Sequence, residues 1–172
     1  MALDDGRSSL GQTAKGLAAR ECGSREFNFS AADFERVRKL IYAHAGISLS
    51  PIKQDMVYSR LARRLRATGK SSFAAYLDAL ERDGGEEWER FVNSLTTNLT
   101  SFFREPHHFP IFADHLKQLG TRRPIRVWCS AASTGEEPYS IAITILETFG
   151  SQVSHVSIFA SDLDTNVLET AR

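Results

Sequence analysis

The stretch that decides the fold is residues 125–142, which read Ile125-Arg126-Val127-Trp128-Cys129-Ser130-Ala131-Ala132-Ser133-Thr134-Gly135-Glu136-Glu137-Pro138-Tyr139-Ser140-Ile141-Ala142. Its first residues are mostly β-branched or aromatic and follow Pro124, so they predict a buried strand. Small residues and Gly135 predict a turn, and the apolar residues every fourth position after it predict a helix. Strand, tight turn and helix form the first half of a βαβ unit, where open α/β sheets bind ligands.

A second strand is predicted at residues 156–160, followed by Ser161-Asp162-Leu163-Asp164. Asp162 stands where α/β nucleotide-binding folds place the acid that holds a ribose diol, roughly 20 residues or more beyond the turn. The chain ends at Arg172, inside a helix that begins at Asp164 or Thr165. Two parallel strands cannot cover their own faces or edges, so we expect the rest of the sheet to come from a downstream segment or a partner.

Four short amphipathic helices are predicted between residues 27 and 95, and they describe a small all-α domain. The first begins with a capping box made by Ser30 and Asp33, and the second begins at Ser50-Pro51 by the cap-then-proline rule. Residues 1–26 have no convincing period and are expected to form a mobile tail. Residues 96–120 are expected to connect the two domains. They contain a Thr-rich segment and then a helix from Pro106 to Gly120 whose inward residues are Phe109, Phe112, Leu116 and Leu119.

The composition of the chain argues against several classes of protein. The 21 basic and 21 acidic residues balance, so the molecule as a whole is not a polyanion binder. The two cysteines, Cys22 and Cys129, have no disulfide-framework or metal-site spacing, and the five histidines form no HxxxH or HExxH set. We therefore expect no metal and a reduced, cytoplasmic setting. The apolar stretches are far shorter than the ~18 residues of a membrane span, so no direct membrane insertion is expected.

The second helix carries a cluster of basic residues. At about 100° per residue, Lys53, Arg60, Arg63 and Arg64 fall on one side, away from the inward stripe Val57, Leu61 and Leu65. A solvated basic face is the common outcome for such a run. No acids on the same helix pair with it, however, which favours an anionic partner. An acidic protein helix or a nucleic acid would fit, although no aromatic residues are interleaved for stacking on bases.

The turn at residues 131–137 lacks both GxGxxG and GxxxxGK[ST], which weighs against phosphate binding. Glu136 and Glu137 at the helix start suit a ligand with a cationic amine, and S-adenosylmethionine has an ammonium, a sulfonium and a ribose diol. The alternative is that both glutamates only complement the helix dipole. Arg104, beside two phenylalanines, could clamp a carboxylate or be a surface residue near a helix end. Asn98 and Thr100 are cap or turn residues by default.

Three segments together carry a family resemblance: Asn98 to Glu105, Ala131 to Ser140 and Ala160 to Asp164. They resemble the chemotaxis receptor methyltransferases of the CheR type, over about residues 27–172. The resemblance implies a Rossmann-like α/β methyltransferase domain at residues 121–172, after the helical domain at 27–95 and the connecting segment at 96–120. It also implies a domain truncated after its second strand, because the family continues with the rest of its sheet.

The resemblance further implies an activity and roles for particular residues. The family uses S-adenosylmethionine to methylate glutamate side chains on the cytoplasmic helices of chemoreceptors, leaving S-adenosylhomocysteine. Asn98, Thr100 and Arg104 would line the cofactor and methyl-transfer site, with Arg104 as the catalytic residue. Glu137 would bind the methionine ammonium and Asp162 the ribose. Lys53, Arg60, Arg63 and Arg64 would face the acidic receptor helix, and a monomer is expected.

Two other functions remain open from the residues alone. One is a non-catalytic module that binds S-adenosylmethionine or a receptor. The other, which is the weaker of the two, is a nucleic-acid methyltransferase, which would show salt-steep affinity for DNA or RNA. No nucleic-acid partner is expected.

Overall fold

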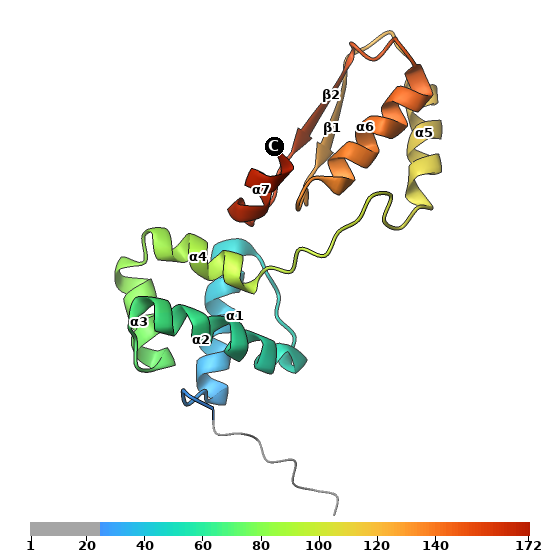
Figure 1. Cartoon of the computed structure of the whole chain (residues 1–172). Coiled ribbons are helices and arrows are strands. Elements are labelled where there is room, and N and C mark those ends of the chain that lie inside the picture. Colours follow the sequence, from blue (N-terminus) through green and yellow to red (C-terminus); the bar gives the residue numbers. More distant parts are fainter. Residues whose placement is uncertain (1–24) are drawn as a thin grey trace, which may run out of the picture.

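The chain folds into two groups of elements joined by an extended segment after α4 (Figure 1). The computed structural model describes residues 25–172. The helical group contains α1 (Ala31–Ala45), η1 (Pro51–Lys53), α2 (Gln54–Thr68), α3 (Phe73–Asp83) and α4 (Glu86–Leu95). The α/β group contains α5 (His108–Leu119), β1 (Ile125–Cys129), α6 (Glu136–Phe149), β2 (Val156–Ala160) and α7 (Thr165–Ala171). The expected mobile tail lies outside the described residues except for residues 25 and 26.

The ends of the helices follow the predicted capping chemistry. Ser30 and Asp33 form the capping box of α1: the Ser30 side chain accepts from Asp33 N at 3.1 Å, and Asp33 Oδ2 accepts from Ser30 N at 2.9 Å. Gly46 ends this helix in the left-handed region at φ 69°. The start of the second helix differs from the prediction. Pro51 opens a 3₁₀ turn rather than an α-helix, and the Ser50 side chain makes no capping hydrogen bond, so α2 begins only at Gln54.

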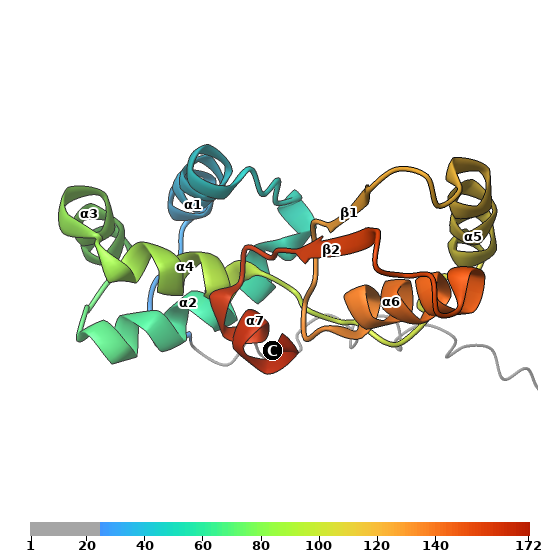
Figure 2. The ribbon, with the colours of Figure 1, turned by 90° about the horizontal axis from the view of Figure 1, so that it is seen from above.

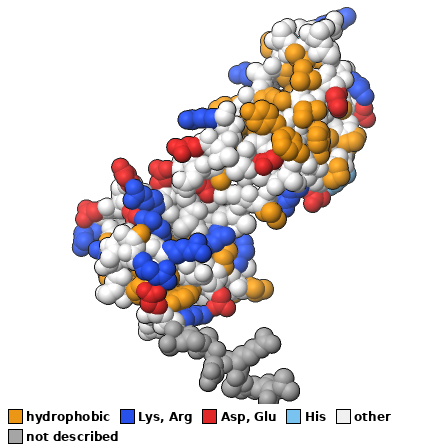
Figure 3. Space-filling view, in the orientation of Figure 1, with side chains coloured by type: hydrophobic (Ala, Val, Ile, Leu, Met, Phe, Trp, Pro, Cys, Tyr) orange, Lys and Arg blue, Asp and Glu red, His pale blue; other side chains and the backbone are white. Residues whose placement is uncertain are grey.

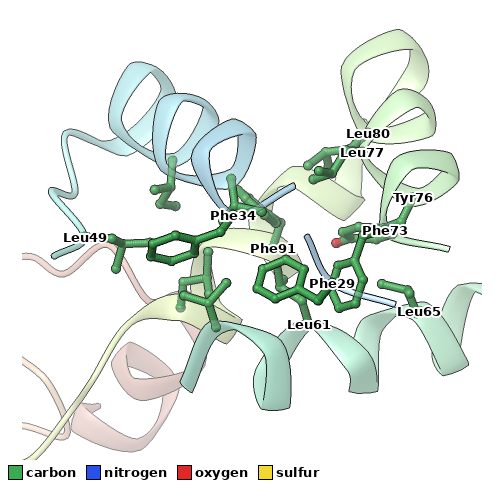
Figure 4. Packing of buried hydrophobic residues seen from close by; sticks show 14 of the residues in the cluster. Phe29, Phe34, Leu49, Leu61, Leu65, Phe73, Tyr76, Leu77, Leu80 and Phe91 are labelled. Carbon is green, nitrogen blue, oxygen red and sulfur yellow. The ribbon is translucent and has the colours of Figure 1, made fainter. Parts of the chain in front are cut away.

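The helical group has one apolar core, to which every one of its α-helices contributes (Figure 4). Phe29, just before α1, packs its ring 4.4 Å from that of Phe73 on α3. The buried residues of α2 are Val57, Leu61, Ala62 and Leu65, which include the predicted stripe. Each large apolar side chain that is fully buried contributes roughly 1.5–3 kcal/mol. Burial of these side chains therefore stabilises the packing of the four helices against one another.

The sheet contains two parallel strands, with Ile125 opposite Val156 and Cys129 opposite Ala160. Helix α6 connects the strands and packs against α5, and the two helices lie together at one side of the sheet (Figure 2). Trp128 was expected to be buried but is 68% exposed, because the opposite face of β1 is not covered by another described element. Leu119 was expected inward and is also exposed, at the last turn of α5.

The surface differs between the two groups. In Figure 3, Lys and Arg side chains are concentrated on the helical group, whereas exposed apolar side chains gather on the α/β group. Large exposed apolar residues of the latter include Ile111, Trp128, Leu146 and Phe159. None of the helices within residues 25–172 has both the length and the apolar character needed to cross a bilayer.

Candidate cofactor and methyl-transfer site

A cavity of about 490 Å³ lies at the carboxyl ends of both strands, beside the connecting segment. This is the position where open α/β sheets bind ligands, and the volume is typical of small-molecule sites. The structure brings together all five predicted cavity residues: Asn98, Thr100, Arg104, Glu137 and Asp162. Glu137 lies in the first turn of α6, which follows β1, and Asp162 lies in the loop after β2. The parallel pairing of β1 and β2 brings both carboxylates to the same cavity.

The turn after β1 owes its shape to two residues with positive φ. Ser133 is at φ 47° and Gly135 at φ 108°, which lets the chain reverse sharply before α6 begins. A Cβ on Gly135 would lie 3.3 Å from Ala171 and from the ring of Tyr139. Ala132 N donates to the carbonyl of Ser161 at 2.9 Å, so this turn is tied to the loop after β2. These contacts fix the turn, from which Ala131 and Ser133 line the cavity.

Asp162 supports the turn and also borders the cavity. Its Oδ2 accepts from Ser133 N at 2.8 Å and its Oδ1 from Asp164 N at 2.9 Å. Each oxygen of an ionised carboxylate has about two acceptor positions, so each can still accept one further hydrogen bond. The hydroxyls of a ribose diol would supply two such donors. The role predicted for Asp162, to accept hydrogen bonds from a ribose, is therefore compatible with the structure.

Glu137, in the first turn of α6, meets His108 at the start of α5. His108 Nε2 lies 3.6 Å from Glu137 Oε1, too far for a direct hydrogen bond. This nitrogen is shielded from solvent and has no hydrogen-bond partner within residues 25–172. Glu137 borders the cavity and accepts no hydrogen bond from His108, so its carboxylate can still accept from a ligand.

The connecting segment is held in an unusual conformation where it passes the cavity. Phe103 and Glu105 are both at φ 52°, in the left-handed region that non-glycine residues rarely adopt. Phe103 N donates to the Oγ of Ser140 on α6 at 2.9 Å. Such strain costs of order 1–3 kcal/mol per residue and concentrates at functional sites. Between them, Arg104 donates to the carbonyl of Leu99 at 2.7 Å and remains exposed at the cavity edge.

Sequence reasoning missed three residues that build this site: His108, Ser133 and Asp164. Asp164 is 4% exposed and accepts from Asn98 Nδ2 at 2.6 Å. Both Ser133 and Asp164 lie in segments that carry the family resemblance, but the residues alone predicted Asp164 only as a possible helix start and Ser133 only as part of a turn of small residues. For His108 the sequence favours packing over a place in the site, whereas the structure places this residue at the cavity.

The four residues predicted to face the receptor, Lys53 in η1 and Arg60, Arg63 and Arg64 in α2, do not line this cavity, and two of the four are bound within the helical group. Arg64 donates to both oxygens of Glu87 on α4, at 2.9 and 2.6 Å, and this hydrogen bonding raises its pKa. Arg60 donates to the carbonyls of Ser94 and Thr96 at the end of α4. The sequence showed no acid on the same helix to pair with these basic residues, but the structure pairs Arg64 with Glu87 from α4.

Lys53 and Arg63 are exposed, and neither forms an ion pair in the part of the chain that the structure describes. The same range holds no group of three His, Cys, Asp or Glu residues placed to bind a metal ion. Cys129 is buried at the cavity wall, and burial raises the pKa of its thiol. The side chains available to a ligand in the cavity are thus carboxylate, amide, hydroxyl, imidazole and guanidinium groups.

Comparison with known proteins matches both groups of elements to one family. Residues 32–96 match the model described as "CheR methyltransferase, all-alpha domain", and residues 98–172 match "CheR methyltransferase, SAM binding domain". The chain is 55% identical over 151 residues to chemotaxis protein methyltransferase 2 of Pseudomonas aeruginosa, covering 87% of this chain and 54% of that protein. It is also 55% identical over 144 residues to the chemotaxis protein methyltransferase of Escherichia coli, covering 83% of this chain and 50% of that protein.

A more distant relative is the probable chemotaxis protein methyltransferase of Rhizobium etli, 39% identical over 140 residues, 77% of this chain and 52% of that protein. The chain spans about half the length of the curated relatives it matches. The order of the two matched models agrees with the helical group followed by the α/β group and its cavity. This chain belongs to the CheR family of chemotaxis methyltransferases.

Proposed function

We propose that this chain carries the methyl-donor site of an enzyme that transfers a methyl group from S-adenosylmethionine to glutamate side chains of chemoreceptors. The observation that carries the proposal is the single cavity in which Glu137 and Asp162 meet Asn98, Thr100 and Arg104. Glu137 would bind the methionine ammonium, Asp162 would accept from the ribose, and Asn98 and Thr100 would line the cofactor.

The reaction requires the glutamate carboxylate to be aligned with the methyl group, and it requires no proton transfer. When bound, S-adenosylmethionine would supply a methyl group attached to a positively charged sulfur. As the carbon–sulfur bond breaks, the sulfur keeps the bonding electrons and becomes a neutral thioether. A glutamate side chain has a reference pKa of about 4.3, so at neutral pH its carboxylate already has the electron pair that forms the ester bond. Arg104 would orient that carboxylate and exclude water from it, in place of a general base.

The receptor would dock on the surface formed by Lys53 of η1 and by Arg60, Arg63 and Arg64 of α2. Lys53 and Arg63 are exposed and can form new ion pairs, so they would contribute most. Arg60 and Arg64 would add positive potential while remaining bound to α4. An acidic helix would be attracted to this surface, which favours a protein substrate over a small carboxylate.

The test separates binding from transfer. Calorimetry with S-adenosylhomocysteine reports on the cavity, and transfer of labelled methyl groups to a receptor cytoplasmic fragment reports on the reaction. We expect Glu137→Gln to weaken binding and Arg104→Ala to abolish transfer while the fold is kept. Binding without transfer by the complete protein would instead favour a non-catalytic module. Absence of binding would overturn the assignment of the cavity.

A further inference from the structure

We propose that Asp164 is a positioning residue that couples the segment leaving the helical group to the cavity acid Asp162. Its carboxylate is buried, and the groups that donate hydrogen bonds to it are neutral. Oδ1 accepts from the backbone N–H of Asn166 at 3.1 Å. Oδ2 lies 2.8 Å from Thr96 Oγ1 and 2.6 Å from Asn98 Nδ2. A buried carboxylate needs such donors because it has lost its water.

Asp164 belongs to a closed ring of four residues. Asn98 Nδ2 donates to Asp164 Oδ2, and Asp164 N donates to Asp162 Oδ1 at 2.9 Å. Ser133 N donates to Asp162 Oδ2 at 2.8 Å, and Ser133 Oγ donates to the carbonyl of Asn98 at 3.1 Å. The ring joins the segment after α4, the turn after β1 and the loop after β2. These are three of the segments that wall the cavity.

Helix capping alone does not account for this arrangement. An N-cap requires one side-chain oxygen, and Oδ1 fills that role for α7. Oδ2 points away from the helix to Thr96 and Asn98 instead. A second link between the groups lies beside it, where Asn93 Nδ2 on α4 donates to Thr165 Oγ1 at 2.9 Å. Asp164 therefore stands where the helical group, which would face the receptor, meets the loop that presents Asp162.

The substitution Asp164→Asn separates the two roles. Asparagine caps a helix as well as aspartate does, but its amide has one oxygen and one nitrogen. If the oxygen caps α7, the nitrogen faces the amide nitrogen of Asn98, so two donors meet or the Asn98 amide must turn; in either case the charge-assisted hydrogen bond is lost. If the amide is turned, the cap is lost. Asp114→Asn is the matched control, since Asp114 is exposed and pairs only with Lys117 on its own helix among the described residues.

Amide hydrogen exchange of the ligand-free protein tests the coupling without any assumption about the ligand. We expect Asp164→Asn to speed exchange about tenfold in residues 96–98 and 131–135, the loss of one charge-assisted hydrogen bond. Residues 131–135 are not bonded to Asp164 itself; the ring reaches them through Asp162 and Ser133, whereas the contact of Gly135 with Ala171 passes on only a change within α7. Faster exchange in residues 96–98 together with 131–135 is therefore the result that the ring predicts. Faster exchange confined to residues 165–171 would mean that Asp164 is a cap and nothing more, and would overturn the proposal.

A second measurement connects the ring to the cavity, and it rests on the proposed function. We expect Asp164→Asn to weaken S-adenosylhomocysteine binding about tenfold, and its effect to be non-additive with that of Asn98→Ala. Additive effects in a protein that binds the ligand would overturn the coupling alone. A wild-type protein that does not bind it would overturn the proposed function, while hydrogen exchange would still decide the role of Asp164.

Discussion

The imidazole Nε2 of His108 faces Glu137 Oε1 at 3.6 Å across the cavity wall, and no described group hydrogen-bonds to that nitrogen. Both residues line the cavity, and the carboxylate of Glu137, which accepts no hydrogen bond from His108, would be available to a cationic ligand there.

Arg64 is expected to stabilise the helical group. Its bidentate pair with Glu87 joins α2 to α4, and Glu87 Oε1 also accepts from the hydroxyl of Tyr76 at 2.8 Å. Removing one partner of a partly buried pair leaves the other charge without its partner. We therefore expect Arg64→Ala to lower the free energy of unfolding by about 1.5–3 kcal/mol. Urea denaturation measures this, and the exposed neighbour Arg63→Ala should change stability by under about 0.5 kcal/mol.

The exposed basic residues are expected to act on the receptor instead. We expect the double variant Lys53→Glu and Arg63→Glu to raise the KM for an acidic receptor fragment about tenfold at low salt, with kcat little changed. The difference from wild type should shrink as salt is added, because both residues are solvent-exposed. Unaltered KM at low salt would remove α2 from the docking surface. Thermal unfolding of the same variant checks that the fold is kept.

Cys129 is expected to react slowly with iodoacetamide. Burial raises the pKa of its thiol, so less thiolate is present at a given pH. In a Cys22→Ser background at pH 8, we expect alkylation to be at least about tenfold slower than for free cysteine. Because Cys129 lines the cavity, S-adenosylhomocysteine should slow it further. Urea-unfolded protein, which should react at the ordinary rate, is the control.

The capping box of α1 is expected to contribute a measurable part of the stability. Ser30→Ala removes the acceptor for Asp33 N, and we expect it to lower the free energy of unfolding by about 1 kcal/mol. Ser151→Ala, at an exposed position after α6, should have almost no effect. Equal denaturation midpoints for Ser30→Ala and the wild type would show that the box does not stabilise α1.

Local patterns along the chain predicted the elements, because capping and periodicity act within a few residues. Ser30 and Asp33 mark the start of the first helix in the sequence, and the structure has the capping box there. The burial of Trp128 was predicted wrongly, because strand propensity does not tell which face of a sheet another element covers. The pairing of Arg64 was missed because helical spacing reports acids on the same helix, whereas Glu87 lies on α4.

The sequence by itself determined the order of helices and strands, the family, and the five residues expected at the cavity. These follow from local pattern and from motifs whose spacing the chain preserves. Only the tertiary structure decided how those residues share their hydrogen bonds. Asn98 donates to Asp164, Asp162 supports Ser133, and Glu137 faces His108 across elements distant in sequence. Such partners are set by the parallel pairing of β1 with β2 and by the packing of α5 on α6, which no short stretch of sequence encodes.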